Sequence, residues 1–248
     1  MRPDAKEKIA TAAPKKGPNP VIIGAVVGVV MIVAVVAAIV FGNSGKPAGG
    51  RVGSALPSGV VAEGGGIVAN VATAKANAPT LDIYEDFQCP GCGDLERRVG
   101  ADITSLAKAG DVKLVLHILS FLDANLKNDS STRSANATAC AADAGKAMEY
   151  HAAVFAAQPA QEGVGYTDAQ LTEFAGTAGI TGDALTTWQT CTTSAEHAKY
   201  VADVQTNAEK AAVNSTPTVK LNGQDITKSL LSPDGPASLV AQVKAATK

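Results

Sequence analysis

The longest run of apolar positions in the chain is VIIGAVVGVVMIVAVVAAIVF, residues 21–41, which contains no charge and no proline. As a helix with a rise of about 1.5 Å per residue, this run reaches about 31 Å and covers the hydrocarbon core of a bilayer. It has no polar face, as a buried amphipathic helix would have. The following FGNSG does not resemble a signal-peptidase site. The pattern therefore predicts an uncleaved transmembrane anchor.

The charges around this run predict its orientation. Five basic residues precede it and only two follow within the next ten positions: Arg2, Lys6, Lys8, Lys15 and Lys16 before, Lys46 and Arg51 after. Positive charge stays on the cytoplasmic side, so residues 1–20 are expected in the cytoplasm and the rest outside the cell membrane. Residues 42–63 are rich in Gly, Ser, Pro and Ala, which predicts a flexible linker.

From residue 64 the pattern is that of a folded α/β domain. GIVAN, residues 66–70, is expected to form a short edge strand, and the β-prone TLDIYEDF, residues 80–87, a longer one. A nearly continuous apolar run follows at 112–122, typical of a strand covered on both faces. Between them, four apolar residues share one face of a helix that ends at Gly110: Leu95, Val99, Ile103 and Leu106. This order predicts a βαβ unit with parallel strands.

The next part of the domain is predominantly helical, and β-structure returns after it. Helices are expected over 131–157, over 167–179 with a capping box of Thr167 and Gln170, over 182–190 and over 194–212. A hairpin with Asn222-Gly223 at its turn follows, then a last helix starting at Ser232 and Pro233. The order predicts a thioredoxin-like α/β fold over 64–248, with a helical insertion at about 125–212.

Composition and charge exclude few classes of function. The chain has 248 residues with a formal net charge of −2, and only 4% of them are aromatic. Nothing in this balance favours nucleic acid as a partner.

Four cysteines carry the candidate chemistry: Cys89, Cys92, Cys140 and Cys191. Disulfides persist outside the cytoplasm, and four cysteines allow three pairings. If Cys89 pairs with Cys92, the other bond would close a loop of about 50 residues and stabilise the fold by roughly 4 kcal/mol. A zinc site is disfavoured because the second pair is widely spaced and the three histidines stand alone. We expect no metal and no cofactor.

The motif Cys89-Pro90-Gly91-Cys92 lies between a predicted strand and a predicted helix. Pro90 suits the first helical position, which leaves Cys89 at the N-cap. Free N–H groups and the helix dipole favour a thiolate there, and such cysteines fall from a pKa of about 8.5 to between about 3.5 and 7. Cys92, one turn on, is placed to resolve a mixed disulfide. The alternative is a structural disulfide between these two residues.

Pro217 is a second candidate element, because it immediately precedes an apolar strand in NSTPTV. Proline is unusual there unless its peptide bond is special. A cis Thr216–Pro217 bond would leave the Thr216 backbone free to pair with an extended substrate.

Five blocks in order, namely YEDFQCPGC, SANATACAADAGK, EYHAAVFAAQPAQEGVGYTDAQL, WQTC and NSTPTVKLNG, resemble the membrane-anchored DsbA-like thioredoxin domains of actinobacteria. The resemblance covers residues 64–248. It implies a redox-active pair at Cys89 and Cys92, a cis Pro217 facing that pair, and a structural bridge between Cys140 and Cys191. It also implies unfolded secreted proteins as substrates and a membrane reoxidase similar to vitamin K epoxide reductase or DsbB.

The chain departs from the pattern of such enzymes at two positions. The best-known periplasmic oxidases carry a histidine where this chain has Gly91. The chain therefore lacks one group that stabilises the thiolate and favours strong oxidising power. The buried acid found six residues before many such nucleophiles is Ile83 here. Glu85 or Asp86 could relay protons instead, although an acid at this place is more often solvated or caps the helix. His151 is expected to be a packing or surface residue.

We therefore expect a membrane-tethered thiol–disulfide oxidoreductase acting mainly as an oxidase on secreted or cell-envelope proteins. A reductase or isomerase of the same fold is the first alternative. A non-catalytic module that binds copper or an extracellular peptide is the second.

Overall fold

The fold is described from a computed structural model, in which residues 53–60 and 62–247 are described. The expected cytoplasmic tail, the expected anchor at 21–41 and residues 42–52 of the expected linker lie outside this range. Within the described range, no helix combines the length and the apolar character needed to cross a bilayer.

A five-stranded mixed sheet forms the centre of the domain, in the order β1-β3-β2-β4-β5. The central strands β2 and β3 are parallel, and the other neighbours are antiparallel. Leu81 of β2 lies opposite Leu114 on one side and Leu221 on the other, which continues the apolar core across the sheet. The five strands predicted along the chain are present, and so is the parallel βαβ unit; their bounds are Ile67–Val68 (β1), Thr80–Glu85 (β2), Lys113–Ile118 (β3), Thr218–Leu221 (β4) and Gln224–Asp225 (β5).

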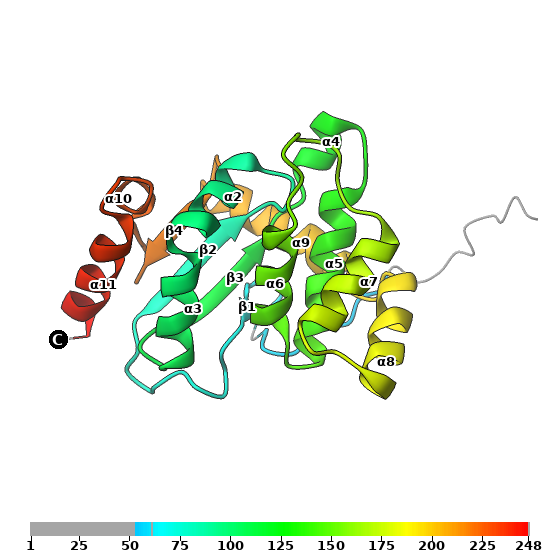
Figure 1. Cartoon of the computed structure of the whole chain (residues 1–248), viewed down its shortest axis with the longest axis horizontal. Coiled ribbons are helices and arrows are strands. Elements are labelled where there is room, and N and C mark those ends of the chain that lie inside the picture. The colour runs from blue at the N-terminus through cyan, green and yellow to red at the C-terminus, as the bar shows by residue number, and fades with distance from the viewer. Residues whose placement is uncertain (1–52, 61, 248) are drawn as a thin grey trace, which may run out of the picture. The chain divides into compact units, whose positions relative to one another are not determined.

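The crossover from β2 to β3 is one helical rod in three parts (Figure 1). It consists of α2 (Pro90–Leu95), the π-helical η1 (Glu96–Gly100) and α3 (Ala101–Lys108). Its predicted apolar stripe packs on the sheet, since Leu95, Val99 and Ile103 are all buried. The π-helical turn is a feature that the apolar spacing did not predict. Such turns are rare and occur often at functional sites.

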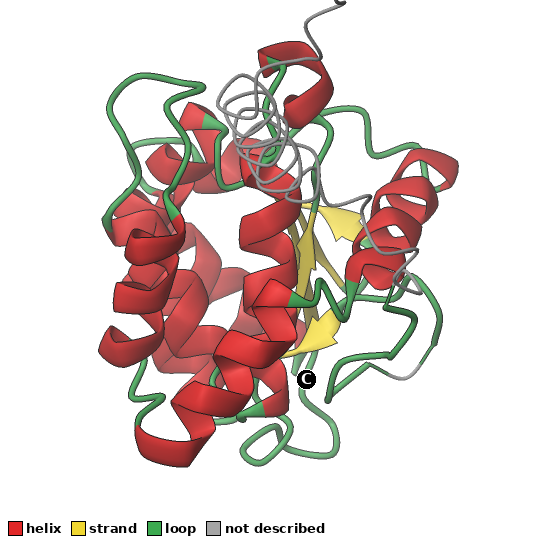
Figure 2. Ribbon diagram, turned by 90° about the vertical axis from the view of Figure 1, so that its right-hand side faces the viewer, coloured by secondary structure: helices red, strands yellow, loops and turns green. Residues whose placement is uncertain are grey.

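The helical insertion forms a bundle beside the sheet (Figures 1 and 2). Its central helix α5 is buried along most of its length, because its Ala, Ser and Thr side chains let α6, α8 and α9 approach closely. The predicted helix over 131–157 is interrupted at Gly145, which has a positive φ of 67°. The elements are α4 (Leu122–Leu126), α5 (Ser130–Asp143), α6 (Ala147–Ala156), α7 (Asp168–Thr177), α8 (Gly182–Thr193) and α9 (Ala198–Lys210).

Three predicted boundaries are wrong. The helix predicted from Ser194, α9, begins at Ala198, because Ser194 caps the end of α8. The last helix α11 (Gly235–Ala246) begins after Asp234 and not at Ser232, because a separate short helix α10 (Thr227–Leu230) comes first and Pro236 takes the first-turn position. The expected linker also extends too far. The Ser58 N–H donates to Asp143 at the end of α5, and the backbone N–H of Lys199 in α9 donates to the Gly53 carbonyl. The folded domain therefore includes residues 53–60.

The disulfide of the domain joins Cys140 of α5 to Cys191 of α8, with a sulfur–sulfur distance of 2.01 Å. Both residues are buried. Trp188, one turn before Cys191, is buried beside them and donates its indole N–H to the Ala137 carbonyl. The bridge predicted from the resemblance is therefore present and ties two helices of the insertion together.

Candidate active site

Cys89 lies at the N-cap of α2, directly after the turn that follows β2. Its backbone is extended (φ −76°, ψ 118°), and its carbonyl accepts the N–H groups of Cys92 and Gly93. Pro90 occupies the first turn as predicted, where a missing N–H is harmless. Cys89 and Cys92 are both free thiols; Cys89 is partly exposed and Cys92 is buried. The first sulfur is thus accessible to another protein and the second is shielded.

The two thiols have opposite acidities. The pKa of Cys89 falls to about 6, chiefly because the Cys92 thiol donates a hydrogen bond to its sulfur. Burial opposes this, while Thr216 and the N–H groups of Cys92 and Gly91 add to it. The pKa of Cys92 is raised, first by burial, then by its bond to Cys89 and by the charge of Glu85. At neutral pH the negative charge of the pair therefore resides on Cys89.

The loop before β4 faces this sulfur. The Thr216–Pro217 peptide bond is cis, and Sγ of Cys89 lies 3.6 Å from the Thr216 carbonyl oxygen. Gly91 lies against the same loop, since a Cβ there would be 3.3 Å from Cδ of Pro217 and 3.7 Å from Sγ of Cys89. The structure therefore brings together all of the predicted active-site positions: Cys89, Pro90, Gly91, Cys92, Thr216 and Pro217.

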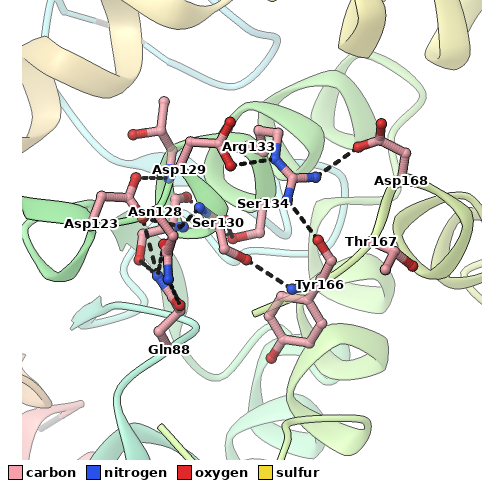
Figure 3. A network of polar contacts seen from close by, with 12 residues as sticks. Gln88, Asp123, Asn128, Asp129, Ser130, Arg133, Ser134, Tyr166, Thr167 and Asp168 are labelled. Carbon is pink, nitrogen blue, oxygen red and sulfur yellow. Dashed lines mark hydrogen bonds and ion pairs between the residues drawn. The ribbon is translucent and has the colours of Figure 1, made fainter. Parts of the chain in front are cut away.

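The helical insertion holds the turn before Cys89 through Gln88 (Figure 3). The buried Gln88 side chain exchanges amide hydrogen bonds of 2.9 Å with Asn128 in both directions. Its amide nitrogen also lies 3.0 Å from Asp123 and 2.8 Å from Ser131. Asp123 in turn accepts the N–H of Ser131 in the first turn of α5. The residue next to the nucleophile is thus fixed to the insertion.

A second glutamine supports the same turn from the end of α6. The Gln158 amide nitrogen lies 2.9 Å from the carbonyl oxygens of both Phe87 and Cys89, and the Tyr166 hydroxyl also donates to Phe87. The sequence did not single out these residues. A lone amide at the end of a helix carries no periodic or motif signal, and only the folded chain places it near Cys89.

Glu85 and Asp86 are both fully buried, so the expectation that they are solvated is wrong. The reason is that the insertion covers the end of β2. Asp86 accepts hydrogen bonds from the Gln88 and Leu122 N–H groups and from the Ser131 hydroxyl. Burial nonetheless raises its pKa to about 6. Asp86 therefore anchors the turn and does not cap α2.

Glu85 points to the other side, toward the cysteines. Burial, followed by the charge of Cys89, raises its pKa well above the ordinary value. Its Oε2 lies 2.8 Å from Nε2 of His151 on α6, while its Oε1 has no hydrogen-bond partner among residues 53–60 and 62–247. His151 is buried, which agrees with the packing alternative and not with the surface one, and burial lowers its pKa.

The half-buried Glu96 completes a cluster with these two buried residues. Glu85, Glu96 and His151 each place one ligand atom within 4.8 Å of the others, which makes them the set that could hold a cation near the active site. A second set contains Cys140, Cys191 and His197, but its two sulfurs are consumed in the disulfide. Both sets were missed in the sequence because their members lie far apart along the chain.

Comparisons with known proteins agree with this geometry. The protein-family model described as Thioredoxin matches residues 70–241. The reduced form of disulfide bond oxidoreductase DsbG from Mycobacterium tuberculosis is 30% identical, with a TM-score of 0.57, over 70% of this chain and 85% of that one. Reduced DsbA from the same organism is 29% identical, with a TM-score of 0.57, over 70% and 90%.

A third similar structure comes from another organism. MdbA, a thiol-disulfide oxidoreductase from Corynebacterium diphtheriae, is 25% identical, with a TM-score of 0.59, over 77% of this chain and 94% of that one. No curated protein sequence matches the chain. The chain belongs to the thioredoxin family and is a DsbA-like thiol–disulfide oxidoreductase of the actinobacterial type.

Proposed function

We propose that Cys89 and Cys92 are the redox-active pair and that the protein acts as an extracytoplasmic disulfide oxidase. The observation that carries this proposal is the partly exposed Cys89 at a helix N-cap, with a pKa near 6, beside a buried Cys92. A sulfur that is stable as a thiolate is a good leaving group, so a disulfide that contains it is readily transferred.

In the oxidase direction a substrate thiolate attacks Sγ of Cys89 in the Cys89–Cys92 disulfide. The new bond joins the substrate to Cys89, and Cys92 leaves as a thiolate that takes up a proton. A second substrate thiolate then attacks the mixed disulfide, releasing the oxidised substrate and the Cys89 thiolate. The substrate loses two electrons and the protein gains them.

The Thr216–Pro217 loop is the proposed backbone-binding element. An open groove of about 840 Å³ runs beside it, lined by Ser215, Pro217, Lys228 and Leu231 among others. An extended peptide in this groove would pair with the Thr216 backbone, which directs a substrate cysteine toward the sulfur of Cys89. Pro90 and Gly91 shape the start of α2, and Cys140–Cys191 is a structural bridge without a redox role.

The proposed setting follows from residues 1–63 and from the resemblance. A single-pass anchor at 21–41 would hold the enzyme in the cell membrane, with its N-terminus in the cytoplasm and its catalytic domain outside. Secreted or cell-envelope proteins with cysteines would be its substrates. A membrane reoxidase similar to vitamin K epoxide reductase or to DsbB would remove the electrons.

A reductase or isomerase role is the second candidate, and Gly91 favours it. A side chain at position 91 would lie next to Sγ of Cys89, but this residue is glycine. No histidine there stabilises the thiolate, so the disulfide is a weaker oxidant than one with a basic neighbour.

The deciding experiment measures the reduction potential of the Cys89–Cys92 couple in the full chain together with its two activities. The oxidised protein should restore activity to reduced, denatured ribonuclease. A reduction potential of about −120 mV supports an oxidase. A reduction potential of about −270 mV, with fast insulin reduction, supports the reductase role. If Cys89→Ser leaves both activities unchanged, the assignment of the pair is wrong.

A further inference from the structure

Cys92 must exchange a proton each time it attacks or leaves, yet it is buried beneath Cys89. The buried acid that acts on it is Glu85, whose charge raises the pKa of Cys92. Glu85 is itself fully buried and cannot exchange protons with bulk water directly. A path from Glu85 to solvent is therefore required if the acid is to serve in repeated turnovers.

His151 provides the first step of such a path. Its Nε2 lies 2.8 Å from Oε2 of Glu85. Its ring is enclosed by aromatic side chains, with centroids 5.7 Å from Phe87 and 4.9 Å from Phe155. Among the described residues, the polar groups that lie close to the imidazole are the carboxylates of Glu85 and Glu96. Since one protonated carboxyl costs less in an apolar site than a separated ion pair, Glu85 and His151 share one proton.

Glu96 provides the opening to solvent. It belongs to η1, which packs against α6, and an open groove of about 450 Å³ lies between these elements. Glu96, Gly100, Ala152 and Phe155 line this groove. The carboxylate folds back over Gly100, where a Cβ would collide with its Oε2. The missing side chain of Gly100 thus lets Glu96 reach both His151 and the groove.

We propose that His151 and Glu96 are positioning residues that carry protons between Glu85 and the groove, and so set the rate at which Cys92 reacts. This inference rests on the proposed function of the cysteine pair. In the attack step, Cys92 gives its proton to Oε1 of Glu85 while Oε2 gives up the shared proton to His151. Cys92 bonds to Sγ of Cys89, and the bond from Cys89 to the substrate sulfur breaks. A proton then passes from His151 to Glu96 and water. When Cys92 is the leaving group the proton returns by the same path.

The charged and titratable groups around this path are few. Cys89 and Cys92 face it from α2, Glu85 from β2, and His151 from α6. Glu96 has a pKa of about 7, raised by burial and by Glu85 and lowered by His151. At the mouth of the groove lies Arg97, which pairs with Asp94 at 2.6 Å.

Ellman's reagent separates the two cysteines kinetically in the full chain. The Cys89 thiolate first releases one thionitrobenzoate anion and retains the other as a mixed disulfide. Attack by Cys92 then releases the second anion and closes the Cys89–Cys92 bond. The first phase tests the proposed function, and its absence in the unaltered protein would refute that function. The second phase tests the proton path.

The second phase should slow about tenfold in His151→Phe and in Glu96→Gln, a fraction of the roughly 10²–10⁴-fold that general acid–base catalysis supplies. Its rate should then rise with hydroxide concentration without the plateau of the unaltered protein. Gly100→Ala should have the same effect without removing a charge, because the displaced atom is the end of a flexible side chain.

Two controls distinguish proton transfer from mere packing. His151→Gln keeps a hydrogen-bond donor for Glu85 but cannot pass a proton, so it should remain slow. Asp94→Asn removes one charge from the same helical rod outside the cluster and should react normally. The proposal is overturned if His151→Gln restores the rate and the plateau, or if Glu96→Gln matches Asp94→Asn.

Discussion

The two cysteine pairs of this domain have the same chemistry but different surroundings. Cys89 and Cys92 are separated by two residues at the start of a helix, and Cys89 is partly exposed with a pKa near 6. Cys140 and Cys191 are 51 positions apart, buried, and bonded to each other within a packed bundle. Reactivity thus follows from helix position and access, while stability follows from the length of the closed loop.

The sharpest test of this contrast removes one sulfur from each pair. In Cys89→Ser, thiol–disulfide exchange should fall by about 10³-fold or more, because a neutral hydroxyl replaces a thiolate nucleophile. Turnover with a small fluorescent disulfide measures this loss. The fold should be unaffected, as judged by circular dichroism. If Cys191→Ala costs as much activity under stabilising conditions, the division between reactive and structural pairs is wrong.

Opening the second bridge should act on stability instead. The double variant Cys140→Ala, Cys191→Ala loses a loop constraint estimated at about 4 kcal/mol of unfolding free energy. Urea unfolding at constant pH measures the difference. Cys89 should keep its pKa, because the bridge joins α5 to α8 and contacts neither α2 nor the Thr216 loop. A large shift in the Cys89 pKa would show that the two regions are coupled.

Gln88 is the residue that connects the two regions. In Gln88→Ala, the half-buried Asn128 and Asp123 and the buried Ser131 each lose a hydrogen bond, which should cost about 1–3 kcal/mol in unfolding free energy. Exchange by Cys89 should also become slower, since the turn before it is less well held. Gln205→Ala is a matched control, because that side chain, on α9 of the insertion, accepts the N–H of Ser120 and not a group of the turn before Cys89. Equal losses in the two variants would contradict the role of Gln88.

A smaller change tests the surroundings of the reactive sulfur alone. In Gly91→His, an imidazolium beside Sγ should lower the pKa of Cys89 by about one unit and make the disulfide more oxidising. Thiolate absorbance as a function of pH measures this shift. Gly91→Ala is the control, since it places the same Cβ 3.3 Å from Pro217 without a charge. If both variants shift the pKa equally, contact with the loop and not charge is responsible.

The same contrast explains what could be predicted from the sequence. The strands and the crossover helix follow from local patterns, so their bounds were predicted within a few residues. The location of Cys89 at the start of a helix follows from the same patterns. Glu85, His151 and Glu96 come from a strand, the insertion and a π-helical turn, and no spacing connects them. The expectation that Glu85 is solvated failed because the cover over β2 comes from a segment more than 60 positions away. Long-range burial of polar groups leaves no periodic signal.

The smallest expected effect concerns residues 53–60, which were predicted as part of the linker but pack on the folded domain. His197 of α9 is buried, with its Nδ1 2.8 Å from the Ala55 carbonyl and its Nε2 2.8 Å from Asp143. Both neighbours are acceptors, so the imidazole is bound in its doubly protonated form. The pKa of His197 is raised: burial, the largest single influence, lowers it, but the bonds to Asp143 and Ala55 and the nearby carboxylate charges together outweigh burial. The pKa of Asp143 is lowered: burial, again the largest single influence, raises it, but the bonds from His197 and Ser58 and the charge of His197 together outweigh burial.

The signs of these shifts give a window of maximum protection for the segment. The contribution of His197 is complete below the unfolded histidine pKa of about 6.5 and is lost as the pH rises through its higher folded value. The contribution of Asp143 is present above about 3.9 and is lost as the pH falls through its lower folded value. Hydrogen exchange of the Ser58 N–H, which donates to Asp143, should therefore be slowest relative to its intrinsic rate between about pH 4 and 6.5. His197→Gln should remove this dependence and cost about 1 kcal/mol in local opening, less than a fully buried charged bond because Asp143 is 40% exposed. Protection that is independent of pH in the unaltered protein would mean that the segment is held by its backbone contacts alone.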